Sequence, residues 1–218
     1  RYSECGSRNF AKTFTLKNGI RVATYNLPQL KSVHVQVSVK GGSIVESKEN
    51  NGIAHFIEHM LVQGIPSYPD AEALSSHVES LAGTYSAYTQ LLKTGFSITL
   101  PASCLDDALH ITSEIFFEPL FKDVAVEKER EAVLDEITQD LDSHFYKIND
   151  FFLKKRFASS SPLVLHTAGS PQAIKKLTRE ELIAFWSTYF IPKNTYILVT
   201  GSFNELNLEK LLIKYLFF

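Results

Sequence analysis

The stretch that decides the fold reads GIAHFIEHMLV, from Gly52 to Val62. Its apolar residues recur with the three-to-four-residue period of a helix, not with the two-residue period of a strand. On that helix His55, Glu58 and His59 lie at positions i, i+3 and i+4 and share one face. Two imidazoles at this spacing can bind one tetrahedral Zn²⁺ ion, and the carboxylate between them can reach a water molecule beside the metal. The stretch therefore predicts a zinc site with Glu58 as general base.

The order of these residues is the reverse of the His-Glu-x-x-His motif and is the signature of inverzincin metallopeptidases. In the alternative interpretation the two histidines are hydrogen-bonded core residues, as a single histidine on an apolar helix usually is. A catalytic zinc site needs three protein ligands and an open coordination position. The zinc hypothesis therefore requires an acidic residue from another part of the chain.

The elements around this helix predict the fold class. Period-two alternation and turn residues predict strands at residues 12–16, 20–26, 33–39, 83–88, 95–101 and 196–200, the first two forming a hairpin. Helical periodicity predicts helices at residues 71–81, 105–117, 124–157 and 179–189, and a last helix from Asn204. Thr178 and Glu181 form the expected capping box of the fourth of these helices. Interspersed strands and helices predict an α+β fold in one domain, with a mixed, largely antiparallel sheet packed against several helices.

Composition and charge exclude several classes of partner. The 218 residues are 44% hydrophobic, and the formal net charge is −2, which favours neither nucleic acid nor an anionic membrane as a general partner. The basic cluster Lys154-Lys155-Arg156 is interpreted as a solvated helix face. No run of 18 apolar residues occurs, so no membrane span is predicted.

The ends and the cysteines bear on the setting of the protein. The start, from Arg1 to Cys5, lacks the layout of a signal peptide, which predicts an intracellular protein of the bacterial cytoplasm or of an organelle such as the mitochondrion. Cys5 and Cys104 are interpreted as free thiols, with a disulfide as the open alternative. The segment from Leu211 to Phe218 has the pattern of an interrupted amphipathic helix, which predicts that the chain is part of a longer protein.

The stretch from Gly52 to Leu61 resembles the core motif of the pitrilysin and mitochondrial processing peptidase family, whose members are inverzincin zinc metallopeptidases. That family carries its third zinc ligand, a glutamate, in a later helix with the pattern Glu-Arg-x-x-Val-x-x-Glu. The matching stretch here reads EREAVLDE, from Glu129 to Glu136. The resemblance implies that Glu136 is the third ligand and that Glu129 supports the site from outside the ligand set.

The resemblance covers the whole chain. Further matches in family order lie at residues 18–22, 41–43, 79–83, 87–89 and 170–200. It implies that residues 1–218 form one zinc-binding N-terminal peptidase domain and that a second, homologous C-terminal half is absent. Members of the family close two such halves around the substrate, so the C-terminal half or a homologous partner subunit is expected as a partner.

Two departures from the family pattern concern substrate contacts. Residues 62–65 read VQGI where the family usually has Phe-Lys-Gly-Thr, and Ser86 stands where an asparagine commonly precedes Ala-Tyr-Thr. In the family a peptide lies as an added strand along a sheet edge near the zinc. The segment from Gly83 to Thr89 is the predicted edge, with Ser86, Ala87 and Tyr88 as predicted substrate contacts.

These observations predict a zinc metalloendopeptidase domain with one Zn²⁺ per chain. Its expected substrates are oligopeptides or presequence-like segments, and it is expected to need a second domain or partner for full activity. The alternative is a non-catalytic, structural subunit of the kind found among the family's core proteins in respiratory complexes. A non-peptidase metal-binding protein is a third interpretation, in which Glu58 has no role. The complete motif favours the peptidase.

Overall fold

A computed structural model describes residues 11–216. Within this range the strands are β1 (Lys12–Thr15), β2 (Arg21–Asn26), β3 (Ser32–Lys40), β4 (Thr84–Thr89), β5 (Lys93–Pro101) and β6 (Thr195–Gly201). The α-helices are α1 (Ile53–Leu61), α2 (Ala71–Ser80), α3 (Leu105–Phe117), α4 (Asp123–Asp142), α5 (His144–Arg156), α6 (Pro171–Ile174), α7 (Arg179–Tyr189) and α8 (Glu205–Leu216). Short 3₁₀ turns span η1 (Ser43–Val45), η2 (Ala102–Cys104), η3 (Pro162–Val164) and η4 (Pro192–Asn194).

The six strands form one sheet in the order β1-β2-β6-β3-β5-β4. The β2–β6 pair is parallel and the other pairs are antiparallel, so the predicted mixed, largely antiparallel sheet of an α+β fold is confirmed. The first two strands form the predicted hairpin, with Lys12 opposite Thr24. Among the described strands β4 lies at one edge of the sheet, as the sequence predicts for the segment ending at Thr89.

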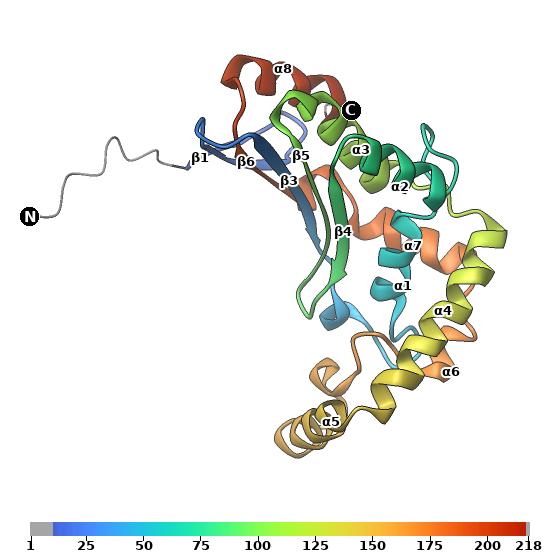
Figure 1. Ribbon diagram of the computed structural model, residues 1–218. Coiled ribbons are helices and arrows are strands. Elements are labelled where there is room, and N and C mark those ends of the chain that lie inside the picture. Colours follow the sequence, from blue (N-terminus) through green and yellow to red (C-terminus); the bar gives the residue numbers. More distant parts are fainter. Residues whose placement is uncertain (1–10, 217–218) are drawn as a thin grey trace, which may run out of the picture.

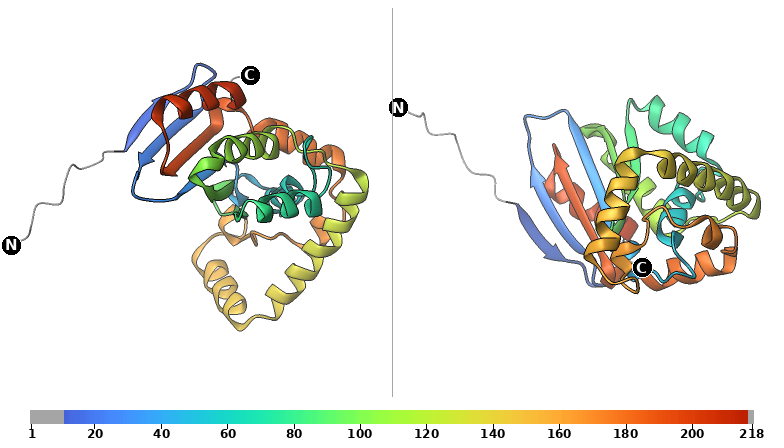
Figure 2. Two further views of the ribbon diagram at one scale, coloured as in Figure 1. Left: turned by 45° about the horizontal axis from the view of Figure 1, so that its top comes forward. Right: turned by 90° about the horizontal axis from the view of Figure 1, so that it is seen from below.

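The helices cover one face of the sheet (Figures 1 and 2). The alternating residues Val33, Val35, Val37 and Val39 of β3 are buried under this layer, while the residues between them are only half-buried. Helix α1 lies between β4 and α4, and its apolar side chains are almost completely buried (Figure 1). Helix α1 therefore occupies the centre of the fold, with the sheet edge on one side and α4 on the other.

The beginning of α1 depends on a close contact between two glycines. Gly52 precedes the helix with φ at 96°, in the left-handed region, and Gly169 also has a positive φ of 103°. A Cβ atom on Gly52 would lie 2.6 Å from the Cα atom of Gly169, which is closer than real side chains approach. Because neither position tolerates a side chain, the chain near Gly169 packs directly against the first turn of α1.

The segment predicted as mostly helical from residue 124 to about 157 consists of two helices. Ser143 has extended backbone angles (φ −66°, ψ 129°), which end α4. Its side chain accepts a hydrogen bond from the backbone N–H of Tyr146 and so caps the beginning of α5. The break turns α5 away from the direction of α4, so that α5 forms the end of the molecule opposite α8 (Figure 1).

The predictions for the two ends of the chain fall outside the described residues, which include neither Cys5 and the start at Arg1 nor the end at Phe218. Cys104 is half-buried at the beginning of α3.

The predicted capping box of α7 is present, with reciprocal hydrogen bonds between Thr178 and Glu181. No helix in the range 11–216 is both long and apolar enough to cross a membrane.

Candidate metal centre

Helices α1 and α4 bring the three predicted zinc ligands together. His55 Nε2 lies 3.5 Å from Glu136 Oε1, and His59 Nε2 lies 3.4 Å from Glu136 Oε2. One ligand atom from each residue falls within 4.8 Å of the other two. Ligand atoms about 2.0–2.1 Å from a tetrahedral zinc ion are about 3.4 Å apart. The donor set and its spacing therefore fit a zinc ion with little movement.

The spacing of the two histidines comes from the helix itself. His55 and His59 are one turn apart, and their ring centroids are separated by 4.7 Å with the rings nearly perpendicular. The apolar residues beside them fix the rotation of α1 because they are buried between the sheet and α4. The histidine face of α1 therefore has to point toward Glu136, where water is partly excluded.

The two imidazoles have opposite pKa shifts. Burial, together with the neighbouring His59 and His166, lowers the pKa of His55 to about 4, so its ring is neutral near pH 7. Burial also acts to lower the pKa of His59. The hydrogen bond to Glu129 and the negative charges of Glu129, Glu58 and Glu136 outweigh burial, so the pKa of His59 is raised. A metal ion would replace the proton that these carboxylates favour.

Glu129 orients the second histidine. Its Oε2 atom lies 2.9 Å from His59 Nδ1, and its side chain is only 8% exposed. A hydrogen bond from Nδ1–H to this carboxylate leaves Nε2 directed at Glu136 as a potential ligand atom. Glu129 thus lies beside the proposed ligands, where the resemblance places it. Glu127, Glu131 and Asp135 of the same helix are exposed and lie away from the site.

Glu58 lies next to the ligand set without belonging to it. Its half-buried carboxylate has a raised pKa, mainly because of burial and also because of the charge of Glu136, while a contact with the Thr89 hydroxyl and the charge of His59 act in the opposite direction. Its Oε2 atom is buried and has no hydrogen-bond partner among the described residues. A buried carboxylate oxygen without a protein partner is suited to accept a proton from a water molecule or a ligand.

The predicted substrate contacts lie on the edge strand β4. Ser86 is exposed, and its hydroxyl donates to the carbonyl of Ala87. Tyr88 crosses over Gly95 of β5, and its hydroxyl accepts a hydrogen bond of 2.6 Å from Gln36. These residues are therefore on the sheet and outside the ligand set, and Thr89 is the residue of this strand that reaches Glu58.

Glu46 is a site residue that the sequence analysis missed. The residue before α1 is Gly52, which has no side chain to cap the helix. The buried carboxylate of Glu46 takes this role by accepting hydrogen bonds from the N–H of Gly52 (2.8 Å), the N–H of Ala54 (3.0 Å) and the side-chain amide of Asn51 (2.9 Å). Burial has the larger effect and raises the pKa of Glu46, while the three hydrogen bonds act in the opposite direction. The signal in the sequence is weak because Glu46 lies six residues before Gly52, outside the usual capping positions.

Asn51 and His166 extend this arrangement. The side-chain amide of Asn51 also donates to the carbonyl of His166 (2.8 Å), and the His166 ring lies 3.3 Å from Asp140 Oδ2 on α4. His166 therefore connects the beginning of α1 with the helix that carries Glu136, close enough to lower the pKa of His55. No motif in the sequence points to His166.

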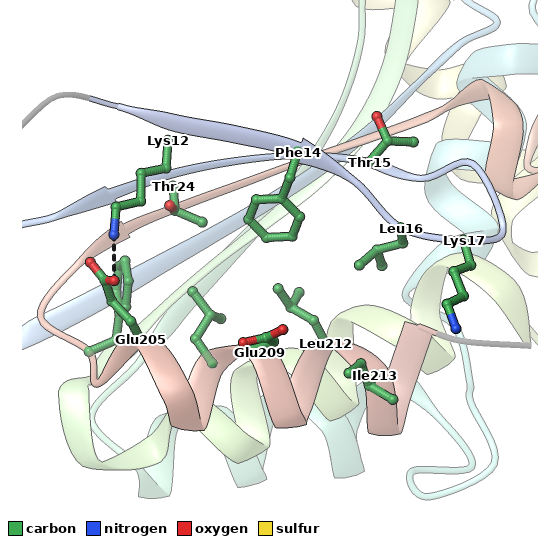
Figure 3. A pocket seen from close by; sticks show the side chains of 12 residues that line it. Lys12, Phe14, Thr15, Leu16, Lys17, Thr24, Glu205, Glu209, Leu212 and Ile213 are labelled. Atoms are coloured by element: carbon green, nitrogen blue, oxygen red, sulfur yellow. Dashed lines mark hydrogen bonds and ion pairs between the residues drawn. The ribbon is translucent and has the colours of Figure 1, made fainter.

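A separate apolar groove of about 520 Å³ lies between β1 and α8 (Figure 3). Phe14, Leu16 and Leu212 line it, and Lys12 bridges its rim to Glu205 at 2.5 Å. The groove includes none of the site residues. It is therefore unrelated to the metal centre.

Comparisons with known proteins agree with the fold and the donor set. Residues 21–168 match the family model described as insulinase (peptidase family M16), and the chain belongs to this family. It is 30% identical over 190 residues to an uncharacterized zinc protease of Rickettsia felis (86% of this chain, 45% of that protein). It is also 30% identical over 188 residues to a probable mitochondrial-processing peptidase subunit beta of Arabidopsis thaliana (86% of this chain, 35% of that protein).

A solved structure supports the same relationship. The chain is similar to a protease from Helicobacter pylori with a TM-score of 0.89 and 25% identity, over 95% of this chain and 50% of that one. The resemblance found in the sequence is thus confirmed. The chain spans half the length, or less, of these relatives.

The first prediction concerns zinc binding. We expect the purified chain to bind about one equivalent of Zn²⁺, and His59→Ala and Glu136→Gln each to lose most of it because one ligand is removed. Metal analysis, after unbound zinc has been removed by dialysis against buffer without chelator, measures the number of zinc ions per chain. Glu131→Gln, on an exposed face of the same helix, is the control and should bind zinc like the wild type. Undiminished zinc in both ligand variants would contradict the assignment.

The second prediction concerns Glu46. Replacing Glu46 with Gln places an N–H₂ group against backbone donors of α1, so we expect the free energy of unfolding to fall by roughly 1–3 kcal/mol. Zinc affinity should fall as well, because the first turn of α1 carries His55. Denaturant titration and competition with a chelator measure the two effects. Glu49→Gln, an exposed carboxylate in the same loop, should change neither; equal effects of the two variants would refute the capping role.

Proposed function

We propose that this chain is the zinc-binding N-terminal domain of a metalloendopeptidase that hydrolyses oligopeptides or presequence-like segments. The observation that carries this proposal is the buried Oε2 atom of Glu58, which has no hydrogen-bond partner within residues 11–216 and lies beside the set His55, His59 and Glu136. Membership of the family and the zinc proteases among its relatives support it. One Zn²⁺ per chain is the cofactor that the donor set fits.

Zinc bound at such a set supplies a Lewis acid, which polarises a peptide carbonyl and favours ionisation of water near neutral pH. In the proposed reaction Glu58 accepts a proton from the attacking water as the new bond to the carbonyl carbon forms. Glu58 then passes this proton to the amine nitrogen as the peptide bond breaks. Glu129 keeps the His59 ring fixed during these steps through its 2.9 Å hydrogen bond.

The edge strand β4 is the proposed binding place of the peptide. Its outer backbone groups have no neighbouring strand in the described sheet, so an extended peptide can pair with them as an added strand. Thr89 of the same strand lies beside Glu58. A peptide paired with Ser86, Ala87 and Tyr88 would thereby extend toward the proposed base, with backbone bonding giving affinity and little sequence specificity.

The alternative function is that of a non-catalytic structural subunit of the same fold. Such a subunit has no need for an intact base, whereas here the three ligands, Glu58 and Glu129 are all in place. A measurement of peptide hydrolysis separates the two functions.

The third prediction tests the base. We expect Glu58→Gln to retain zinc but to lower peptide hydrolysis by the zinc-loaded, active form about 10²–10⁴-fold, because the ligands remain and the proton acceptor is lost. A fluorogenic peptide assay and metal analysis of the same sample measure both properties. Glu131→Gln should keep full activity. If Glu58→Gln lost its metal, Glu58 would be a ligand; if it kept full activity, another group would be the base.

The fourth prediction concerns the remaining part of the proposed enzyme. The chain spans half the length of its relatives or less, and we propose that a C-terminal half or a homologous partner subunit completes the site. We expect the isolated chain to cleave peptides at least about 100-fold more slowly than the completed enzyme, because positioning and exclusion of water contribute several kcal/mol. The comparison requires equal zinc occupancy. Equal rates would show that these 218 residues suffice.

A further inference from the structure

Helix α5 exposes large apolar side chains on one face. Phe145 is 83% exposed, Ile148 70%, Phe151 64% and Phe152 60%; we call these four residues the α5 face. No residue of this helix is buried. A contiguous group of large apolar side chains on a soluble protein marks a surface that binds something.

The orientation of the α5 face is fixed by the other side of the helix. Tyr146, Asp150 and Leu153 are half-buried toward the body of the protein, and the Tyr146 ring packs edge-on against His166 with centroids 4.4 Å apart. Phe145, Ile148 and Phe152 lie at positions i, i+3 and i+7, on the opposite side. The helix lies at the end of the molecule opposite α8 in Figure 1 and in the left view of Figure 2. Because its outer side chains are exposed, this face is accessible to a flat surface.

Cationic side chains surround the α5 face. Lys147, Lys155 and Arg156 have no carboxylate partner in the described part of the chain, and Lys155 lies over the ring of Phe151. The single acidic residue of the helix, Asp150, is turned inward and paired with Lys154 at 2.8 Å. Helix α5 itself therefore carries four cationic side chains and one carboxylate, although the net charge of the whole chain is −2.

This combination limits what can cover the α5 face. A second copy of the chain would bring two sets of uncompensated cations together, which is unfavourable. An anionic lipid surface suits both features, because it accepts apolar side chains at the boundary of headgroups and acyl chains and attracts Lys and Arg. Such a surface also requires no matching groove for a convex helix.

We propose that α5 docks the protein on an anionic lipid surface. The four side chains of the α5 face enter the interface, and Lys147, Lys155 and Arg156 meet the lipid phosphates. The proposal is independent of the peptidase reaction and requires no part of the metal centre.

Sedimentation with vesicles tests the proposal on the intact chain. We expect binding to vesicles of phosphatidylcholine with phosphatidylglycerol to be at least about tenfold tighter than to pure phosphatidylcholine, and to weaken with salt. The double variant Phe145→Ser, Phe152→Ser should reduce the affinity at least about tenfold. Lys155→Gln with Arg156→Gln should remove most of the preference for the anionic vesicles.

Matched controls are available on other helices. Val124 on α4 is 84% exposed and Leu206 on α8 is 71% exposed, so Val124→Ser and Leu206→Ser should bind vesicles like the wild type. The proposal would be overturned if the α5 variants bound anionic vesicles as tightly as the wild type, or if the wild type did not bind them. A dimer in light scattering that dissociates in the Phe145→Ser, Phe152→Ser variant would instead assign the α5 face to a protein interface.

Discussion

The hydrogen bonds from the first turn of α1 to the buried carboxylate of Glu46 determine where the metal centre can form. The backbone N–H groups at the beginning of a helix have no partner within the helix, and here they are buried, so leaving them unpaired would cost free energy. Glu46 satisfies those of Gly52 and Ala54 and benefits from the positive end of the helix dipole. The next residue is His55, so the first proposed ligand lies only one position after the capped Ala54.

A second consequence is the connection between the two helices of the site. Asn51 binds Glu46 and the carbonyl of His166, and the His166 ring lies near Asp140 of α4. The same helix carries Glu129 and Glu136. Helix α1 is connected to α4 through this route and through the hydrogen bond between Glu129 and His59. These contacts hold the proposed ligands in position relative to one another without a metal.

The extent to which the sequence predicts this site follows from the distance between partners along the chain. His55, Glu58 and His59 share a face by helical periodicity alone, and Glu136 and Glu129 were found by resemblance at the correct separation. Glu46, Thr89 and His166 could not be found in this way, because each reaches the site through packing of a separate loop or strand. The prediction that Lys154-Lys155-Arg156 is a solvated face is confirmed, since all three residues are exposed. The exposed apolar residues of the same helix were not predicted, because helical periodicity alone does not show which side of α5 packs against the protein.

The fold was predictable for a related reason. Alternation in β3 and the turn between β1 and β2 are local signals, and the sheet follows from them. The break at Ser143 was not predicted, since a serine within a helical pattern is also tolerated on an exposed face. The break has consequences for the rest of the molecule, because without it α4 would continue straight and α5 would not pack Tyr146 against His166.

The exposure of the site residues shows which side of the candidate metal centre the chain itself closes. The side chains of Glu129, His55 and His59 are 8%, 10% and 21% exposed, whereas that of Glu136 is 46% exposed. The chain therefore closes the site around the two histidines and leaves the side of Glu136 open. A carboxylate that faces water on one side attracts a cation less strongly than a buried one, and a substrate bound there would remain hydrated. Whatever covers this open side, whether the peptide itself or a companion domain, would both strengthen the interaction of Glu136 with the metal and exclude water from Glu58.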